Sequence, residues 1–385
     1  MSSEMRSVRY YSFLVFFAAL HAFLPIYINS SVVLQTTGNA NAFTLTFALG
    51  ALCSLTTFYL APRILSAIGN RWFLIIACGL EGLALLTLSS APTYMWVQAE
   101  VVLYTSMAPL IGYSLDVFFE NSFLNETKTG IARGLFLTSG NTALVLSPII
   151  SGFLAGISFS YVYILASIVL ALFLVIALPA IQNFKDPIYI PATFKDFFNA
   201  CKGDHRAITL AQLVLRIFFG FAAVFMPLLL LSRDFTWPQI GTILGIALLP
   251  FMLFAFPVGR LSDRIGEKLL LILGFCILGA ATYALSFDLP ASLSLYTFIF
   301  FCTRAGAAIV EVTTESNFFR TVGASDSSAI MLFRMTAPIG ALIAVSLGGL
   351  ALLFISLPAL FALVSLLAFF GMIPALYVPK FQKTI

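Results

Sequence analysis

Charged residues are scarce in this sequence, and their scarcity excludes most kinds of soluble protein. Of its 385 residues, 9% are charged and 61% are hydrophobic. A chain of this composition cannot bury its apolar surface in one water-soluble core without leaving large exposed patches. We therefore expect lipid, rather than water, to surround most of the chain.

The residue groups that enzymes and metalloproteins use are also missing. The only two histidines, His21 and His205, lie far apart, and the five cysteines have neither metal-ligand nor disulfide spacing. No Walker-type phosphate-binding loop is present. We expect no enzymatic activity, no metal or other cofactor, no ATPase and no nucleic-acid partner.

What the sequence does contain is a series of unalternated apolar stretches of about 20 residues, the length that an α-helix needs to cross a bilayer. They predict an all-α integral membrane protein. The twelve expected transmembrane helices lie near residues 9–29, 41–61, 72–90, 95–119, 131–154, 159–181, 207–231, 238–258, 268–287, 291–316, 327–347 and 352–377.

One long polar connection divides the twelve helices into two groups of six. We expect a six-helix bundle over residues 1–181, a central loop over 182–206 and a second six-helix bundle over 207–385. Within the loop, Phe194, Phe197 and Phe198 alternate with lysines, a pattern that fits a short helix on the membrane surface as well as a plain linker.

The cations lie almost entirely on one side of this topology. The loops of the opposite side hold only Arg233. The positive-inside rule then predicts that both termini and the central loop are cytoplasmic, in a plasma or inner membrane. The cations of the cytoplasmic side are Arg6, Arg9, Arg63, Arg71, Lys128, Arg133, Lys185, Lys195, Lys202, Arg206, Arg260, Arg264, Lys268, Arg320, Lys380 and Lys383.

The two halves repeat each other. The fourth expected helix carries the acids Asp116 and Glu120, and the tenth carries Glu311 and Glu315, in both cases four residues apart on one helical face. The loop at 63–71, between the second and third helices, also matches the loop at 260–268, between the eighth and ninth. Such ordered matches indicate two pseudo-symmetric bundles.

The second of these loops reads Gly259-Arg260-Leu-Ser-Asp263-Arg264-Ile-Gly266-Glu-Lys. It resembles the signature G-x-L-x-D-r-x-G-r-k of the major facilitator superfamily (MFS), and the resemblance covers essentially the whole chain. It implies a monomeric transporter in a lipid bilayer that moves a small-molecule substrate by rocker-switch alternating access. We expect Gly259 and Gly266 to permit tight turns, Asp263 to face a helix N-terminus and the cations to anchor at the interface.

Charges at membrane depth are costly, by about 2.5–3.5 kcal/mol on insertion scales, and usually face a partner or a water-filled cavity. Arg216 and Arg304 lie near the middle of the seventh and tenth helices, and His21 lies at similar depth on the first. Two converging guanidiniums suit a carboxylate or phosphate, which favours an organic anion as substrate. The alternative is that each arginine pairs with a nearby acid or backbone carbonyl.

The remaining candidates concern proton coupling and gating. Glu81, on the third helix, is a candidate for proton exchange or for structural pairing. The two acid pairs lie near the cytoplasmic helix ends as gate candidates, and we expect Glu311 to pair with Arg334. Asn141, on the fifth helix, is a candidate for substrate hydrogen bonding or for packing between helices.

The function that these patterns favour is secondary transport of a small organic solute, with proton coupling and an organic anion as the finer hypotheses. Efflux of lipophilic compounds in exchange for protons is the main alternative. A membrane sensor that keeps the fold but transports nothing is an alternative of another class.

Overall fold

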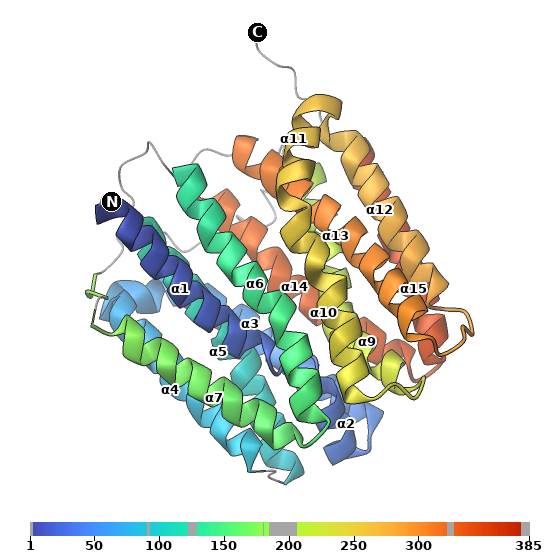
Figure 1. Ribbon diagram of the computed structural model, residues 1–385, viewed down its shortest axis with the longest axis horizontal. Helices are drawn as coiled ribbons and strands as arrows, with labels where there is room; N and C mark the ends of the chain where they lie inside the picture. Colours follow the sequence, from blue (N-terminus) through green and yellow to red (C-terminus); the bar gives the residue numbers. More distant parts are fainter. Residues whose placement is uncertain are drawn as a thin grey trace. The chain divides into compact units, whose positions relative to one another are not determined.

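The computed structural model describes residues 3–90, 93–121, 129–179, 181–184, 206–321 and 327–378, and helices make up nearly all of them (Figure 1). These ranges contain no strand. In these ranges, ten helices are long and apolar enough to cross a membrane, or eleven if α10 and α11, which are bent by 45° at a break, count as one span; α1 contains the shorter apolar segment Val8–Phe23. Each of these helices corresponds to one of the twelve segments that the sequence predicts.

The described residues in the first part of the chain form seven helices. They are α1 (Ser3–Phe23), α2 (Asn29–Thr37), α3 (Ala40–Ile68), α4 (Asn70–Ser89), α5 (Tyr94–Asn121), α6 (Thr129–Ala155) and α7 (Phe159–Ala177). The later part forms α9 (Arg206–Leu231), α10 (Trp237–Leu253), α11 (Ala255–Ile265), α12 (Glu267–Ala284), α13 (Leu293–Thr321), α14 (Ser327–Ala351), α15 (Leu357–Phe370) and α16 (Met372–Leu376).

Contacts divide the chain into two compact units. Unit 1 comprises Met1–Tyr189 with Thr236–Gly245, and unit 2 comprises Ile190–Phe235 with Ile246–Ile385. Most of the expected central loop, residues 185–205 with its three phenylalanines, lies outside the described part of the chain. The division of the sequence at 182–206 therefore stays a prediction.

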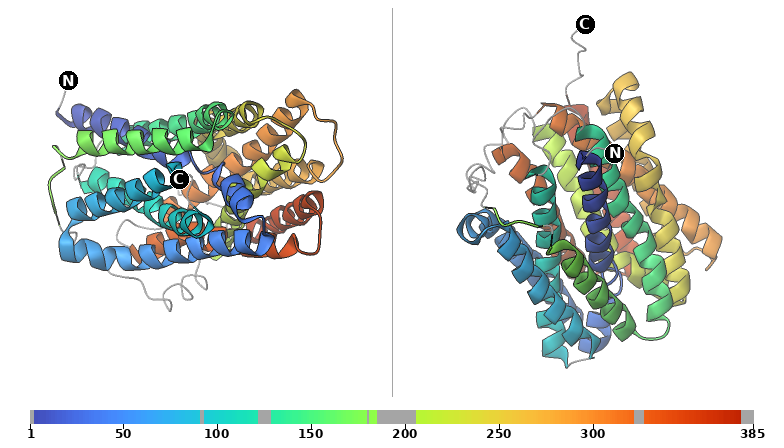
Figure 2. Two further views of the ribbon diagram at one scale, coloured as in Figure 1. Left: turned by 90° about the horizontal axis from the view of Figure 1, so that it is seen from below. Right: turned by 60° about the vertical axis from the view of Figure 1, so that its left-hand side comes forward.

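The packing inside unit 1 has a counterpart inside unit 2. In unit 1, α1 packs on α6, and α4 packs on α5 and α7. In unit 2, α9 packs on α14, and α12 packs on α13 and α15. These are the equivalent helices of the sequence repeat, and Figure 2 shows the helices of each unit running alongside one another.

The matching loops also share a backbone conformation. Gly69, between α3 and α4, has φ 86° and ψ 159°, and Gly266, between α11 and α12, has φ 85° and ψ 154°. This region is open essentially to glycine alone. Because equivalent positions adopt the same rare conformation, the repeat found in the sequence extends to the backbone.

The signature loop differs from expectation at Gly259. This residue lies inside α11, and the backbone has no positive φ there, so only Gly266 makes a tight turn. The guanidinium of Arg260 lies over the ring of Phe256, 4.1 Å from its centroid, just as Arg63 lies over Tyr59 in unit 1. Arg264 is exposed, and the side chain of Asp263 lies outside the described residues.

The first helix ends earlier than predicted. It stops at Phe23, and a turn containing Pro25 leads into α2, because proline lacks the N–H that a continuing helix needs. Side chains from three neighbouring helices bond to this break. Tyr104 Oη donates to Ala22 O, Ser151 Oγ donates to Leu24 O, and Tyr163 Oη donates to Asn29 Oδ1 at 2.8 Å.

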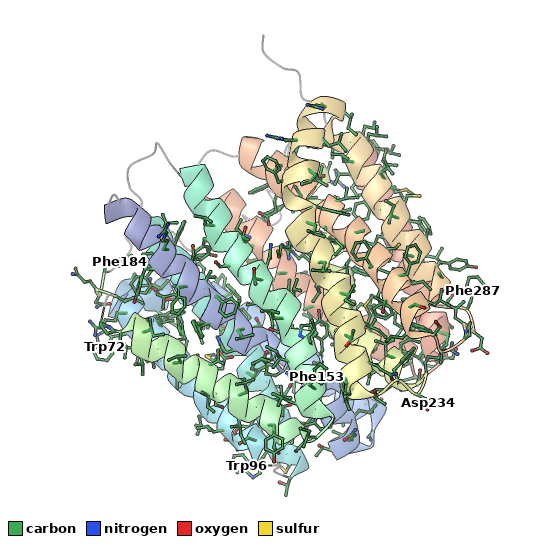
Figure 3. All side chains as sticks on the ribbon, viewed as in Figure 1. Trp72, Trp96, Phe153, Phe184, Asp234 and Phe287 are labelled. Atoms are coloured by element: carbon green, nitrogen blue, oxygen red, sulfur yellow. The ribbon has the colours of Figure 1, made fainter. Side chains whose placement is uncertain are left out.

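The outer surfaces of the helices carry large apolar side chains. Trp72, Trp96 and Phe153, labelled in Figure 3, are all more than half exposed. Trp72 lies near the start of α4, and Trp96 lies near the start of α5. Since tryptophan favours the two membrane–water interfaces, these positions fit helices that a bilayer surrounds.

Candidate functional site

Four charged side chains from three helices of unit 2 form one cluster. Arg216 Nη2 of α9 lies 3.2 Å from Glu311 Oε1 and 3.6 Å from Glu315 Oε1, both on α13. Arg334 Nη1 of α14 lies 3.4 Å from Glu315 Oε1. We call Arg216, Glu311, Glu315 and Arg334 the unit 2 charge cluster.

An uncharged bridge extends the cluster between α9 and α13. In the amide orientation that satisfies all its neighbours, Gln212 accepts from Arg216 Nη2 at 2.8 Å and Nε at 3.0 Å. Its amide nitrogen then donates to Thr314 Oγ1 at 2.6 Å. Gln212 and Thr314 did not figure among the sequence candidates, although Gln212 lies four residues before Arg216 on the same helical face.

Helix geometry brings these groups together. Glu311 and Glu315 are four residues apart, so both face α9. Helix α14 approaches α9 closely at Gly340, where an added Cβ would lie 2.6 Å from the backbone carbon of Arg216. Only glycine permits this approach, which brings the helix of Arg334 against the helix of Arg216.

The cluster is partly open to solvent. The exposed fraction of the side chain is 20% for Arg216, 26% for Glu311, 27% for Glu315 and 46% for Arg334. Arg216 and Glu311 each lie ten residues from a helix end, which corresponds to about 15 Å along the axis. Charges this deep face water or partners rather than hydrocarbon, so the cluster marks a polar, accessible place inside unit 2.

The pairing within the cluster follows one of the two readings of Arg216. Its guanidinium lies between two carboxylates and an amide, as the pairing alternative describes. The sequence predicts that Arg334 pairs with Glu311. In the structure Arg334 forms an ion pair with Glu315, one turn further along α13, and it is also electrostatically coupled to Glu311.

Arg304 lies elsewhere on α13. Its side chain is buried, with Nη2 at 3.5 Å from Met226 Sδ and the guanidinium 5.5 Å from the ring centroid of Phe218. Arg216 contacts a different set of residues, including the ring of Phe219. The two arginines therefore occupy separate surroundings within unit 2.

A second charged site lies in unit 1. His21 Nε2 of α1 is 3.3 Å from Glu81 Oε1 of α4, and both side chains are 0% exposed. His21 Nδ1 is 3.2 Å from Phe17 O. Neither oxygen of Glu81 accepts an aligned hydrogen bond from the described residues. His21, a candidate for substrate binding, and Glu81, a candidate for proton exchange, thus form one buried pair.

The remaining candidates all belong to helices of unit 1. Asp116 is half-buried on α5, and Asn141 is half-buried on α6. The side chain of Glu120 lies outside the described part of the chain. Asp116 and Asn141 both have interaction partners, so neither offers an unused polar group.

Comparison with known proteins points to one family. Residues 208–384 match the Major Facilitator Superfamily. One similar solved structure is a mutant of the nucleoside transporter NupG: it is 11% identical, the match covers 98% of this chain and 100% of that chain, and the TM-score is 0.79. Another is a POT family transporter in complex with a thioalcohol-conjugated peptide: it is 12% identical, the match covers 96% of this chain and 95% of that chain, and the TM-score is 0.75. Among curated proteins, none matches the sequence.

Proposed function

Because the chain belongs to the major facilitator superfamily of secondary transporters, we propose that it carries a small organic solute across the membrane by alternating access. It is a transporter and not an enzyme. The observation that carries the proposal is the unit 2 charge cluster, because charged groups at membrane depth that are partly open to solvent commonly mark a substrate or ion pathway.

The cluster is suited to changing partners. Arg216 lies 3.2 Å from one carboxylate and 3.6 Å from another, so small rotations of its side chain exchange one ion pair for the other. A bound solute that pairs with Arg216 or with an acid would bias this exchange. In the proposed cycle, solute binding thereby changes which charge pairs connect α9, α13 and α14.

The balance of positive and negative charges in the cluster indicates which class of solute it can bind. Two arginines face two glutamates, so a simple anion must displace carboxylates that already neutralise Arg216. A neutral polar or zwitterionic solute makes bonds to both signs without such displacement. We therefore favour that class over an organic anion. A nucleoside and a peptide are the first members to test, because one structurally similar protein is a nucleoside transporter and the other was solved in complex with a conjugated peptide.

The proposal also includes a membrane placement. Both termini and the central loop are cytoplasmic by the distribution of cations, and the proposed location is a plasma or inner membrane. The protein acts as a monomer, and a proton gradient is the proposed energy source. The sequence repeat gives each monomer the two bundles that alternating access requires.

A ligand-stabilisation screen tests the class of solute. Purified protein is heated with uridine, dialanine, lactate or the lipophilic cation tetraphenylphosphonium, and the midpoint temperature is measured. A ligand that binds only the folded protein stabilises it by about 2.7 kcal/mol at a hundred times Kd, and this stabilisation raises the midpoint temperature. We expect uridine or dialanine to stabilise the protein.

Two variants give the screen its specificity. Arg216→Gln should abolish the stabilisation, whereas Arg9→Gln, at an exposed position of α1, should preserve it. Stabilisation by lactate alone would favour an organic anion, and stabilisation by tetraphenylphosphonium alone would favour lipophilic efflux. Either result would overturn the proposed solute class.

A further inference from the structure

The pair formed by His21 and Glu81 has no role in the cluster described above. It belongs to unit 1, it joins α1 to α4, and water reaches neither side chain. Ionisable groups are seldom buried in this way without a structural or functional reason, because each loses its hydration. The two oxygens of Glu81 and Nε2 of His21 also lack aligned hydrogen bonds to described residues, so the pair is not a well-bonded structural clamp.

The pair adjoins the break in the first helix. His21 lies two residues before the end of α1, and the next residue, Ala22, accepts the hydroxyl of Tyr104. Unwound segments of transporter helices commonly adjoin ion sites, since the backbone there is free of helical bonding. The hydroxyls of Ser30 and Ser31, just beyond the break, are buried and have no hydrogen-bond partner among the described residues.

Few other ionisable groups act on the pair. Cys78, one turn before Glu81 on α4, and Tyr104 of α5 are electrostatically coupled to Glu81. Tyr163 of α7 is coupled to Tyr104, and α6 contributes the hydroxyl of Ser151 at the break. Glu100, four residues before Tyr104, is the other buried acid of α5. None of these groups is a cation, so His21 alone can neutralise Glu81 among them.

Charge balance fixes how many protons the pair holds while it is sealed. With one proton shared between imidazole and carboxylate, the pair is neutral overall, either as an ion pair or as two neutral groups. Losing that proton leaves an isolated buried carboxylate, and gaining another leaves an isolated buried imidazolium. Both charged states are strongly disfavoured without water. The sealed pair therefore retains one proton and exchanges it only where water can enter.

We propose that His21 and Glu81 form the site that carries a proton through the transport cycle. The inference rests on the proposed function for its place in the cycle, while proton binding itself depends only on the pair. A histidine suits this role because imidazole titrates within the physiological range. One carboxylate and one imidazole supply too few ligands for a metal ion, which usually takes four or more. The exchanging species is therefore the proton.

Infrared difference spectroscopy tests proton binding without any solute. Protein reconstituted in lipid is stepped between about pH 5 and 8, the interval in which histidine ordinarily titrates, and the carboxyl bands are recorded. We expect a band that Glu81→Gln loses and that His21→Gln moves to another pH. Glu100→Gln, which removes a buried acid outside the pair, should leave this band and its dependence on His21 in place.

Identical difference spectra for wild type and Glu81→Gln would overturn the proposal, since the pair would then exchange no proton. Folding is checked by the thermal midpoint of each variant. Tyr163→Phe, which removes a hydroxyl at the same helix break but leaves both His21 and Glu81 in place, should retain the Glu81 band. If that variant also loses it, the band reports the break rather than the pair, and the proposal fails.

Transport separates this inference from the proposed function. With a solute that the screen identifies, Glu81→Gln should retain exchange of solute across the membrane at equal pH and lose accumulation driven by a pH gradient. Loss of both in Glu81→Gln would contradict a role confined to the proton. Absence of transport in wild type would instead contradict the proposed function and leave the spectroscopic result standing.

Discussion

Water reaches the two charged sites of this protein to different extents, and this difference sets their chemistry. The unit 2 charge cluster is partly open, so solvent screens its ion pairs and lets them exchange partners. The pair of His21 and Glu81 is fully buried, so neither side chain meets solvent in this structure. An open cluster suits binding of a solute, and a sealed pair suits transport of a proton.

The first residue-scale prediction concerns Arg216. Replacing it with glutamine leaves Glu311 and Glu315 with one cation fewer, and we expect the rate of transport to fall at least about tenfold, equivalent to about 1.4 kcal/mol. The loss of folding stability should be only about 1–2 kcal/mol, because a fifth of the side chain is exposed and solvent screens the pair. Uptake into proteoliposomes and thermal unfolding measure the two effects.

A charge exchange provides the control for this variant. The double variant Arg216→Glu with Glu311→Arg restores opposite charges at 3.2 Å, and it should recover part of the stability that either single change loses. Strictly additive losses would show that Arg216 and Glu311 do not interact. Arg9→Gln, at an exposed position, should match wild type in both assays.

Sequence identified the charged members of both sites but not their partners. Arg216, Glu311, Glu315, His21 and Glu81 are conspicuous because a charge within an apolar run is costly. Which groups meet depends on the rotation of each helix and on close approaches such as that at Gly340, which hydropathy does not record. Gln212 and Thr314 were missed because uncharged polar residues are common inside membrane helices.

At the scale of the helix, the break between α1 and α2 is where the chain departs from the predicted straight span. The predicted first helix at 9–29 instead ends at Phe23. Hydropathy could not locate this end, because residues 24–28 are themselves apolar or aromatic, and Pro25 was the only local signal. The break is stable because side chains of α5 and α6 bond to the freed carbonyls of Ala22 and Leu24.

The break should be sensitive to the loss of one hydroxyl. Ser151→Ala removes the donor to Leu24 O in a buried place, and an unsatisfied buried carbonyl costs about 1–3 kcal/mol. Ser167→Ala is the matched control, because Ser167 Oγ bonds to Tyr163 O within its own helix. Thermal unfolding should show a clear loss for Ser151→Ala and little change for Ser167→Ala; equal midpoints would contradict the account of the break.

The two loop glycines give a second test at this scale. Alanine at Gly266 meets no atom within 4 Å, so its cost should be backbone strain alone, about 1–3 kcal/mol. Alanine at Gly69 should cost more, since the added Cβ would lie 2.3 Å from Asn183 Oδ1. Combining Gly69→Ala with Asn183→Ala should remove this difference in unfolding midpoint.

Gly79 supplies the control for both loop variants. It lies within α4 and an added Cβ there meets no atom within 4 Å, so Gly79→Ala should be neutral or slightly stabilising. If Gly69→Ala and Gly266→Ala were equally harmless, the shared positive φ would have no energetic weight, and the repeat would lose its structural support.

At the scale of the whole molecule, the sequence predicted the class of fold well. Its apolar runs correspond to the spans, the matches at 63–71 and 260–268 reappear as one shared glycine conformation, and equivalent helices pack alike in the two units. This success has a physical reason, because lipid forces each crossing segment to satisfy its own backbone bonds as a helix. The orientation in the membrane rests on loop charge and is a proposal open to test.

Labelling of single cysteines tests that orientation. After the five native cysteines are replaced, a cysteine is introduced at Asp288, in the loop between α12 and α13, or at Arg71, near the start of α4. A membrane-impermeant maleimide should label position 288 in intact cells and position 71 only after permeabilisation. The reverse pattern would place both termini outside and contradict the proposed topology.

The central claim is that the chain transports a solute through the unit 2 charge cluster, and exchange in proteoliposomes tests it most directly. Vesicles containing wild-type protein are loaded with unlabelled uridine or dialanine, whichever the screen identifies, and entry of the labelled solute is followed. The account predicts rapid exchange by wild type and Arg9→Gln and at least about tenfold slower exchange by Arg216→Gln. Equal exchange by wild type and Arg216→Gln, or by wild-type vesicles and empty ones, would contradict it.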